Sequence, residues 1–358
     1  MNDYGYQNNS YQQPPDYYSL YTEEKLKEAR GVFSRFHMGL FLFNIVTYAA
    51  VILIEIILSF VMGKGTAGVL LENNIYFEWL LSMGPMYLIG FPVFILIVRN
   101  MKTVSRDTKK MGAQEFFSLF LISQGVMFVG NMIGNTLNSI IGTIIGREIT
   151  NSTSDLIEKT PIWLVLLVVV IVGPIVEELM FRKLMIDRLG RYGDAVAITV
   201  SSIAFGLFHG NFYQFFYAAM LGFVLGYIYT KTGHVKYSIL MHMLINFFGS
   251  VLIMPIIKKM TEIEEMSVIM AEGGNVDLLK FIQNTMAVGT YTIINYVLVF
   301  AGIAMLITYI TGKKFKLSST CEYKIPKERV AGAAILNTGS ILFIVMSLAL
   351  FALSLFAV

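Results

Sequence analysis

The chain has 358 residues, of which 56% are hydrophobic and only 14% are charged, and its formal net charge is +3. An average soluble domain carries about 25% charged residues, so this composition excludes an ordinary water-soluble protein. The small net charge gives no indication of nucleic-acid binding, and the single cysteine, Cys321, excludes an internal disulfide or a multi-cysteine metal site.

The N-terminal segment is polar. Residues 1–21 are rich in Tyr, Asn, Gln and Pro, and they contain neither an apolar run nor a basic start. This composition predicts a disordered tail and not a signal peptide. Residues 22–36 interleave Lys and Glu among helix-forming residues, which predicts an interfacial helix that leads into the first membrane span.

Apolar segments long enough to span a bilayer follow along the chain. A transmembrane helix needs about 20 predominantly apolar residues, and the nine candidates are 38–62, 75–98, 116–145, 161–181, 195–209, 212–230, 237–257, 286–310 and 333–358. The fifth segment is the shortest. We therefore predict an all-α fold, a polytopic membrane helix bundle with about nine transmembrane helices. Its parts are N-terminal transmembrane helices in 37–160, a core at 161–257 and C-terminal transmembrane helices in 286–358.

The distribution of basic residues predicts the orientation, because Lys and Arg accumulate in cytoplasmic loops. With the N-terminus inside, 21 of the 27 basic residues fall in the alternate segments 25–35, 99–110, 182–191, 231–236 and 313–329. This predicts a multi-pass protein of the cell membrane with a cytoplasmic N-terminus and the C-terminus outside. The basic segments would face anionic lipid head groups, and the stretch 258–285 would form an acidic outer loop.

Polar residues occur inside three of the predicted spans. They are Glu177, Glu178, Arg182, His209, His242 and Asn246. A charge at the bilayer centre costs about 2.5–3.5 kcal/mol even on insertion scales, and such residues commonly mark functional sites. Each also has a structural interpretation, as a salt bridge within one helix or a hydrogen bond between helices, and Phe205 is interpreted as a packing residue that orients His209.

Helix geometry predicts how these groups can meet. Glu178 and Arg182 are four residues apart and can pair along one helix face, whereas Glu177 points about 100° away. If the chain turns back near residues 191–194, Glu177 and His209 lie at similar depths, about 20 Å from the turn. We expect a polar chamber reached from the cytoplasmic leaflet, with Gly173 and Pro174 bending the helix beside it.

The residue types in this predicted chamber suit hydrolysis of an amide bond. Glu177 could act as general base on a water, helped by His209, while His242 and Asn246 donate hydrogen bonds to the oxyanion. Alternatively, Glu177, His209 and His242 could bind a zinc ion with water in the fourth position. The residues alone leave both possibilities open.

Three motifs carry a resemblance to a known family. Residues 177–182 (EELMFR), 205–209 (FGLFH) and 242–246 (HMLIN) match the patterns EExxxR, FxxxH and HxxxN. In this order on successive helices they resemble the CAAX protease and bacteriocin-processing (CPBP, or Abi) family of intramembrane endopeptidases, over residues 161–248. The occurrence of all three motifs in this order inside predicted spans is far more specific than any single motif.

The resemblance implies roles for the motif residues. Glu177 would activate water together with His209, His242 and Asn246 would stabilise the oxyanion, and Glu178 and Arg182 would support the site. The family has been described both as zinc metalloproteases and as metal-free glutamate proteases. The resemblance implies that the substrate is a hydrophobic or lipidated peptide, which enters from the lipid bilayer. It implies no nucleic-acid partner.

Two other classes of function could use polar residues inside membrane spans. A proton-coupled transporter also keeps Glu, His and Arg inside the bilayer, but the polar pattern is not repeated in the two halves of the chain. A non-catalytic immunity or chaperone protein could use the same scaffold to bind a peptide. The HExxH, GxSG and GxGD signatures of other intramembrane proteases are absent, and the sequence gives no indication of the oligomeric state.

Overall fold

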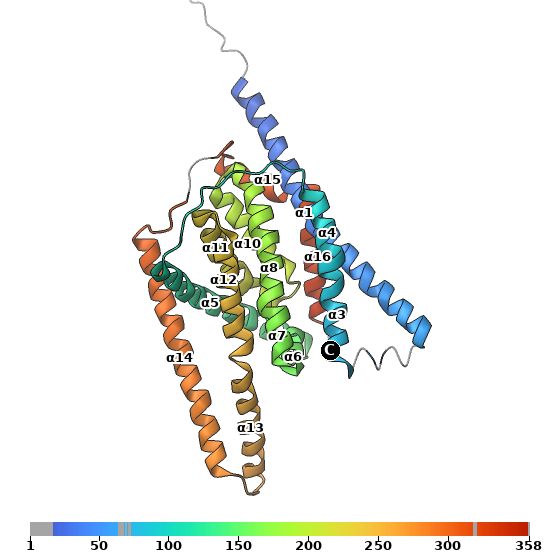
Figure 1. Cartoon of the computed structure of the whole chain (residues 1–358), viewed down its shortest axis with the longest axis vertical. Helices are drawn as coiled ribbons and strands as arrows, with labels where there is room; N and C mark the ends of the chain where they lie inside the picture. Colours follow the sequence, from blue (N-terminus) through green and yellow to red (C-terminus); the bar gives the residue numbers. More distant parts are fainter. Residues whose placement is uncertain (1–16, 64–67, 69, 71–72, 318–320, 357–358) are drawn as a thin grey trace, which may run out of the picture.

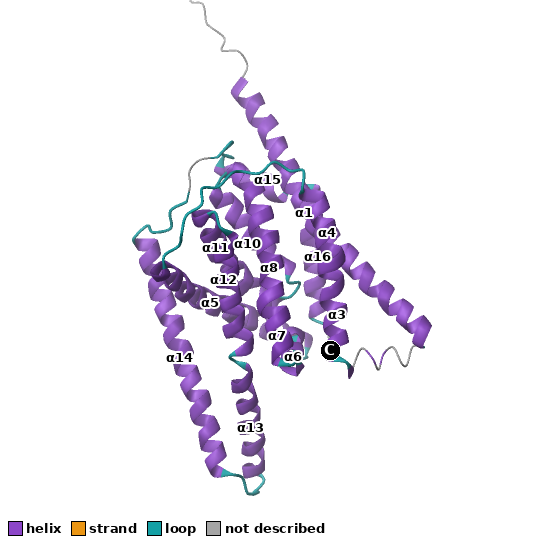
Figure 2. Cartoon of the chain, viewed as in Figure 1, coloured by secondary structure: helices purple, strands orange, loops and turns teal. Residues whose placement is uncertain are grey.

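The computed structural model describes residues 17–63, 68, 70, 73–317 and 321–356. These residues form helices joined by loops, and none of them is in a strand (Figure 2). The protein is therefore an all-α helix bundle, as predicted. The first helices are α1 (Tyr17–Met62), α3 (Ile75–Pro85), the π-helical turn η1 (Met86–Gly90), α4 (Phe91–Val98), α5 (Ala113–Ile145) and α6 (Ser152–Lys159).

The middle of the chain forms a long rod and a hairpin (Figure 1). The rod consists of α7 (Ile162–Val165), the π-helical turn η2 (Leu166–Val172), α8 (Gly173–Glu178), the π-helical turn η3 (Leu179–Ile186), α9 (Asp187–Leu189) and the 3-10 turn η4 (Gly190–Tyr192). The hairpin consists of α10 (Asp194–Phe208) and α11 (Phe212–Thr232). The remaining elements are α12 (Val235–Asn246), the π-helical turn η5 (Phe247–Val251), α13 (Met254–Ala271), α14 (Leu278–Thr311), α15 (Lys327–Ile335) and α16 (Thr338–Ser354).

Each of the nine predicted spans corresponds to helix in the structure. Within the described residues, seven helical stretches are long and apolar enough to cross a membrane, and an eighth arises if α15 and α16, bent by 68°, count as one span. The ninth, α10, has 15 residues, which is about 22 Å of helix and shorter than the roughly 30 Å hydrocarbon core. A polytopic membrane bundle is confirmed, whereas the number of crossings and the orientation stay predictions.

The five basic segments meet at one end of the bundle. The guanidinium of Arg106 binds the carboxylates of Asp187 at 3.1 Å and Asp194 at 2.9 Å, and the backbone N–H of Lys109 donates to the carbonyl of Thr232. Arg191 pairs with Glu28 at 2.9 Å and with Glu322 at 2.8 Å. The fold therefore places all the basic segments on the same side, as the charge pattern requires.

The alternate segments meet at the opposite end. The indole N–H of Trp79 donates to Thr160 Oγ1 at 2.8 Å, and the ring of Tyr76 stacks on Trp163. Arg147 donates to the carbonyl of Leu355. Residues of the first turns of α3, residues that follow α5 and the residue that follows α16 thus share one end of the bundle, which we term the non-basic end.

The N-terminal helix differs from the prediction for 22–36. Helix α1 runs without a break from Tyr17 to Met62, and the side chains of Leu26, Phe33 and Phe36 are completely buried in the protein core. The segment therefore packs one face against the bundle, and its position at the membrane interface stays a prediction. Of the predicted tail 1–21, residues 1–16 lie outside the described residues, and the chain is already helical at Tyr17.

The predicted acidic loop 258–285 is also mostly helical. Helix α13 continues to Ala271 and α14 begins at Leu278, and the two form a hairpin that projects beyond the rest of the bundle (Figure 1). Glu is a good helix former, and the carboxylate of Glu262 accepts from Asn284 at 2.7 Å and pairs with Lys280 at 3.3 Å. The acidic residues thus join two helices, and only the short turn between α13 and α14 is irregular.

The α10–α11 hairpin sits in the centre of the bundle. A Cβ on Gly206 would lie 2.7 Å from the carbonyl oxygen of Phe215, and one on Gly130 of α5 would lie 2.5 Å from the Cα of Tyr217. Small residues therefore allow α5, α10 and α11 to approach closely. The turn between α10 and α11 requires Gly210, whose φ is +67°.

Candidate active site

The rod that carries Glu177 and Glu178 is interrupted by two π-helical turns. Gly173 donates its N–H to the carbonyl of Val168, five residues back, and Pro174 has no N–H to offer to the next carbonyl, that of Val169. The side-chain amide of Asn246 donates to this carbonyl at 2.9 Å. Pro174 thus leaves a backbone acceptor that Asn246 satisfies, which ties α12 to the rod. Sequence analysis missed this role of Asn246, because it depends on a contact between helices.

Glu178, Arg182 and His242 form a buried charged cluster. Arg182 Nε lies 3.1 Å from Glu178 Oε2, and both side chains have no exposed surface, so the pair expected from the four-residue spacing is present. Glu178 Oε1 lies 3.1 Å from His242 Nδ1. Because an ionised carboxylate only accepts hydrogen bonds, Nδ1 of His242 carries the hydrogen and Nε2 faces away from Glu178.

Phe205 lies at the centre of this cluster. The guanidinium of Arg182 stands 4.7 Å from the centroid of the Phe205 ring, a distance that favours a cation–π interaction. The same ring packs edge-on against His209, with a centroid separation of 4.9 Å, and against His242, with a centroid separation of 5.8 Å. Phe205 therefore holds both imidazoles and the guanidinium in place, in agreement with its interpretation as an orienting residue.

His209 is the C-cap residue of α10. Its Nδ1 lies 2.8 Å from the carbonyl oxygen of Phe205, and because a carbonyl can only accept, Nδ1 carries the hydrogen. The amide of Asn211 donates to the carbonyl of His209 at 3.0 Å. These bonds satisfy carbonyls at the C-terminal end of α10, inside an apolar bundle where an unpaired polar group is costly. In the neutral imidazole, Nε2 is then left as a proton acceptor.

Four of the predicted site residues line one cavity of about 570 Å³ inside the bundle: Glu177, His209, His242 and Asn246. Glu177 Oε2 lies 3.6 Å from His242 Nε2, and 24% of the Glu177 side chain is exposed to the cavity, compared with none for Glu178. The fold therefore brings together residues of the rod, α10 and α12 that are up to 69 positions apart. Glu178 and Arg182 lie behind them in the protein interior.

Other polar residues that sequence analysis did not single out line the same cavity. They are Tyr87, Asn131, Asn135, Tyr213, Gln214 and Tyr217, from α5, α11 and the π-helical turn η1. Gln214 Nε2 donates to the hydroxyl of Tyr217 at 3.0 Å and its Oε1 accepts from Asn211 at 2.8 Å. The available signal was the unusual density of Asn in an apolar segment, 116–145.

The candidate zinc ligands do not form a compact set. In the described part of the chain, no group of three or more His, Cys, Asp or Glu residues is arranged to hold a metal ion. Glu177, His209 and His242 share the cavity, but Nδ1 of each imidazole is already engaged by Phe205 or Glu178. Zinc binding by these residues stays a hypothesis.

The cavity extends toward the non-basic end of the bundle. Asn151, Thr153 and Ser154 contribute to its walls, and in the residues that the structure describes no member of the five basic segments does. The sequence predicts a chamber reached from the cytoplasmic leaflet, and the orientation of the chamber in the membrane stays a prediction. About 20 Å of helix, in the rod and in α10, separates Glu177 and His209 from the turn at the basic end.

Comparison with known proteins agrees with this site. A family model described as "Type II CAAX prenyl endopeptidase Rce1-like" matches residues 159–248. The protein named "Putative membrane peptidase YdiL" from Bacillus subtilis is 27% identical over 57% of this chain and 83% of its own length. "Membrane-embedded CAAX protease MroQ" from Staphylococcus aureus is 32% identical over 37% of this chain and 53% of its own length. No solved structure gives a significant match.

The fold and the matched region define a class, that of helical membrane peptidases. The matched residues 159–248 contain all three motifs and all four cavity-lining site residues. Over residues 159–248 the chain is similar to the CAAX prenyl endopeptidases, in agreement with the resemblance that its three motifs carry.

Proposed function

We propose that this protein is an intramembrane endopeptidase of the cell membrane that hydrolyses a hydrophobic or lipidated peptide. The proposal rests on one observation: a carboxylate, two imidazoles and a carboxamide from three separate elements line a single cavity within an apolar bundle. Such a group of polar side chains is costly in a membrane. It contains the acceptors and donors that amide hydrolysis requires.

In the proposed mechanism Glu177 and His209 activate water. The carboxylate of Glu177 and the unprotonated Nε2 of His209 are the two proton acceptors of the cavity. A water held between them loses a proton to Glu177 as its oxygen bonds to the peptide carbonyl carbon. Glu177 then delivers this proton to the amide nitrogen as the C–N bond breaks, so that one carboxylate serves as base and then as acid.

His242 and Asn246 stabilise the oxyanion in different ways. Asn246 uses one amide hydrogen on Val169, which fixes the orientation of the second. His242 can donate from Nε2 only as an imidazolium, because Nδ1–H is bound to Glu178. With His242 protonated, two positive and two negative side chains balance in the cluster of Glu177, Glu178, Arg182 and His242, which avoids a net buried charge.

A reconstituted assay separates this function from the alternatives. The purified protein in liposomes is given a fluorescent hydrophobic peptide, and both cleavage products and peptide inside the vesicles are measured. We expect cleavage products and no net transport. Intact peptide that accumulates in the vesicles would support a transporter, and bound but uncut peptide would support a chaperone or immunity protein.

Metal chelation provides a separate prediction. Because the proposed base and oxyanion donors are protein groups, we expect that EDTA or phenanthroline leaves the cleavage rate unchanged and that elemental analysis finds far less than one zinc per protein. Stoichiometric zinc, with activity lost on chelation and regained on zinc addition, would instead favour the metalloprotease alternative with Glu177, His209 and His242 as ligands.

A further inference from the structure

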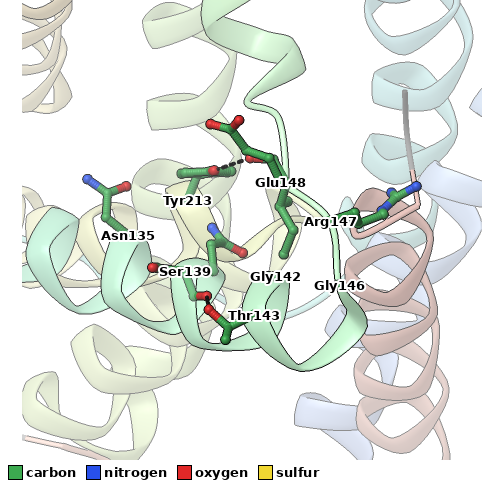
Figure 3. Close-up of a pocket in the computed structure, with 10 residues that line it drawn as sticks. Asn135, Ser139, Gly142, Thr143, Gly146, Arg147, Glu148 and Tyr213 are labelled. Carbon is green, nitrogen blue, oxygen red and sulfur yellow. Dashed lines mark hydrogen bonds between the residues drawn. The ribbon is translucent and has the colours of Figure 1, made fainter.

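A second polar cavity lies beside the chamber, at the C-terminal part of α5. It has a volume of about 730 Å³, and Asn138, Ser139, Thr143, Glu148 and Tyr213 are among its lining residues. Figure 3 shows Ser139 and Thr143 on α5, with Tyr213 and Glu148 on the other side of the space. Neither the motifs nor the family match includes α5, so its polar face has no role in the mechanism above.

The two cavities are adjacent. Asn135 and Tyr213 line both of them, and Asn131, one turn before Asn135, lines the chamber. The two cavities therefore follow one another along α5, from Glu177 toward the non-basic end. We define the α5 groove as the polar face formed by Asn131, Asn135, Asn138, Ser139 and Thr143.

The side chains of the α5 groove are poorly explained by folding alone. Asn is a weak helix former, and a lipid-facing amide is unfavourable in a span. Asn138 is 3% exposed, and its Nδ2 has no hydrogen-bond partner in the described part of the chain. A buried polar group without a partner is destabilising, so a ligand that supplies a carbonyl would relieve this cost.

The spacing of the groove residues matches an extended peptide. Asn131, Asn135, Ser139 and Thr143 follow one another at intervals of four residues, which is about 6 Å along a helix. Alternate residues of an extended chain are separated by about 6.6 Å. Side-chain amides and hydroxyls both donate and accept hydrogen bonds, as backbone peptide groups do. The Thr143 hydroxyl already donates to the carbonyl of Ser139 at 2.9 Å and is left as an acceptor, so successive groove positions can meet every second peptide unit.

The charges at the far end of the groove do not favour an anion such as a lipid phosphate. Arg147 already donates to the carbonyl of Leu355, and its guanidinium lies 5.3 Å from the ring centroid of Phe356. The neighbouring carboxylate of Glu148 lines the same cavity and opposes the positive charge. An uncharged hydrogen-bonding chain fits this surface better than a charged head group.

We propose that the α5 groove binds an extended, polar segment of the peptide substrate next to the bond that is cleaved. This proposal rests on the proposed peptidase function. The substrate would then have two parts: a hydrophobic part at the chamber, and a polar part that lies along α5 toward the non-basic end. The groove contributes binding energy and does not take part in the chemical step.

The test compares a hydrophobic peptide with the same peptide extended at either end by a Ser/Gln/Thr segment. In the wild-type protein we expect the extension at one end to lower KM about tenfold, the gain from two or three ordinary hydrogen bonds, with kcat unchanged. The double variant Ser139→Leu, Thr143→Leu, which changes residues that line the second cavity and not the chamber, should lose this gain while cleaving the short peptide normally. Thr136→Leu, an exposed position of α5 outside both cavities, is the matched control and should keep it.

Equal KM values for the short and extended peptides in the wild type would overturn the proposal, as would a double variant that keeps the gain. If the wild type cuts neither peptide, the peptidase proposal fails, and a photoreactive residue in the extension still tests the groove. Crosslinks to residues 131–143 support it. Crosslinks elsewhere, or equal displacement of both peptides by a short-chain phospholipid, would assign the surface to another ligand.

Discussion

Replacing Glu177 by Gln lowers peptide cleavage by about 10³-fold or more, which is the scale of a lost general base in an active site. Gln has nearly the same shape as Glu but cannot accept the proton of the attacking water. Glu177 is partly exposed to the cavity and is not part of the Glu178–Arg182 ion pair. We therefore expect the variant to insert and to unfold in detergent as the wild type does, and a quantitative peptide cleavage assay checks the result.

The matched variants make this prediction specific. His209→Ala should also abolish cleavage, because it removes the second proton acceptor of the chamber. Glu264→Gln alters an exposed carboxylate of α13 and should leave the activity unchanged. A Glu177→Gln protein with wild-type kcat would contradict the assignment of Glu177 as the base, even if His209→Ala were inactive.

Replacing Arg182 by Leu destabilises the protein by about 3–5 kcal/mol, the cost of leaving a buried carboxylate without its partner. Glu178 and Arg182 are both completely buried, so water cannot compensate for the lost guanidinium. The change also removes the cation–π contact with Phe205. The free energy of unfolding, measured by titration with a denaturing detergent, checks this prediction.

A double variant separates the two roles of this pair. The double variant Glu178→Gln, Arg182→Leu leaves no buried charge without a partner. We therefore expect it to recover much of the free energy of unfolding that Arg182→Leu loses, and a double-mutant cycle measures this recovery. Cleavage should stay low, because the imidazolium form of His242 no longer faces a carboxylate at Nδ1. Full activity of the double variant would show that Glu178 has a structural role only.

An exposed ion pair provides the control for this cycle. Arg329 lies 3.3 Å from Glu23, and more than half of each side chain is exposed. Arg329→Leu should change the stability by no more than about 1 kcal/mol. If Arg182→Leu lowers the free energy of unfolding by no more than Arg329→Leu does, burial does not control the stability contributed by the Glu178–Arg182 pair.

Local patterns predicted much of the site. The four-residue spacing from Glu178 to Arg182 predicted an ion pair along one helix face, and that pair is present. The hairpin argument placed Glu177 and His209 at similar depths, and both line one cavity. These predictions succeeded because the period and rise of an α-helix are nearly constant, so contacts within one helix follow from the spacing.

Predictions that depended on packing between elements were less accurate. Residues 22–36 resemble a surface helix, but Leu26 and Phe33 are buried against the bundle. Residues 258–271 resemble a loop by their charge, but they extend α13 and pair with α14. Composition describes what a segment contains, whereas its place in the fold depends on the partner it meets.

The sequence by itself determined the class of fold, the apolar spans, the basic segments and the three motifs, because hydropathy and helical periodicity are properties of single segments. Only the tertiary structure decided that Asn246 satisfies the carbonyl next to Pro174, that Phe205 holds both imidazoles, and that the chamber extends along α5. Each of these depends on the register and approach of helices distant in the chain. Register and approach are set by many side-chain contacts together, and no single motif encodes them.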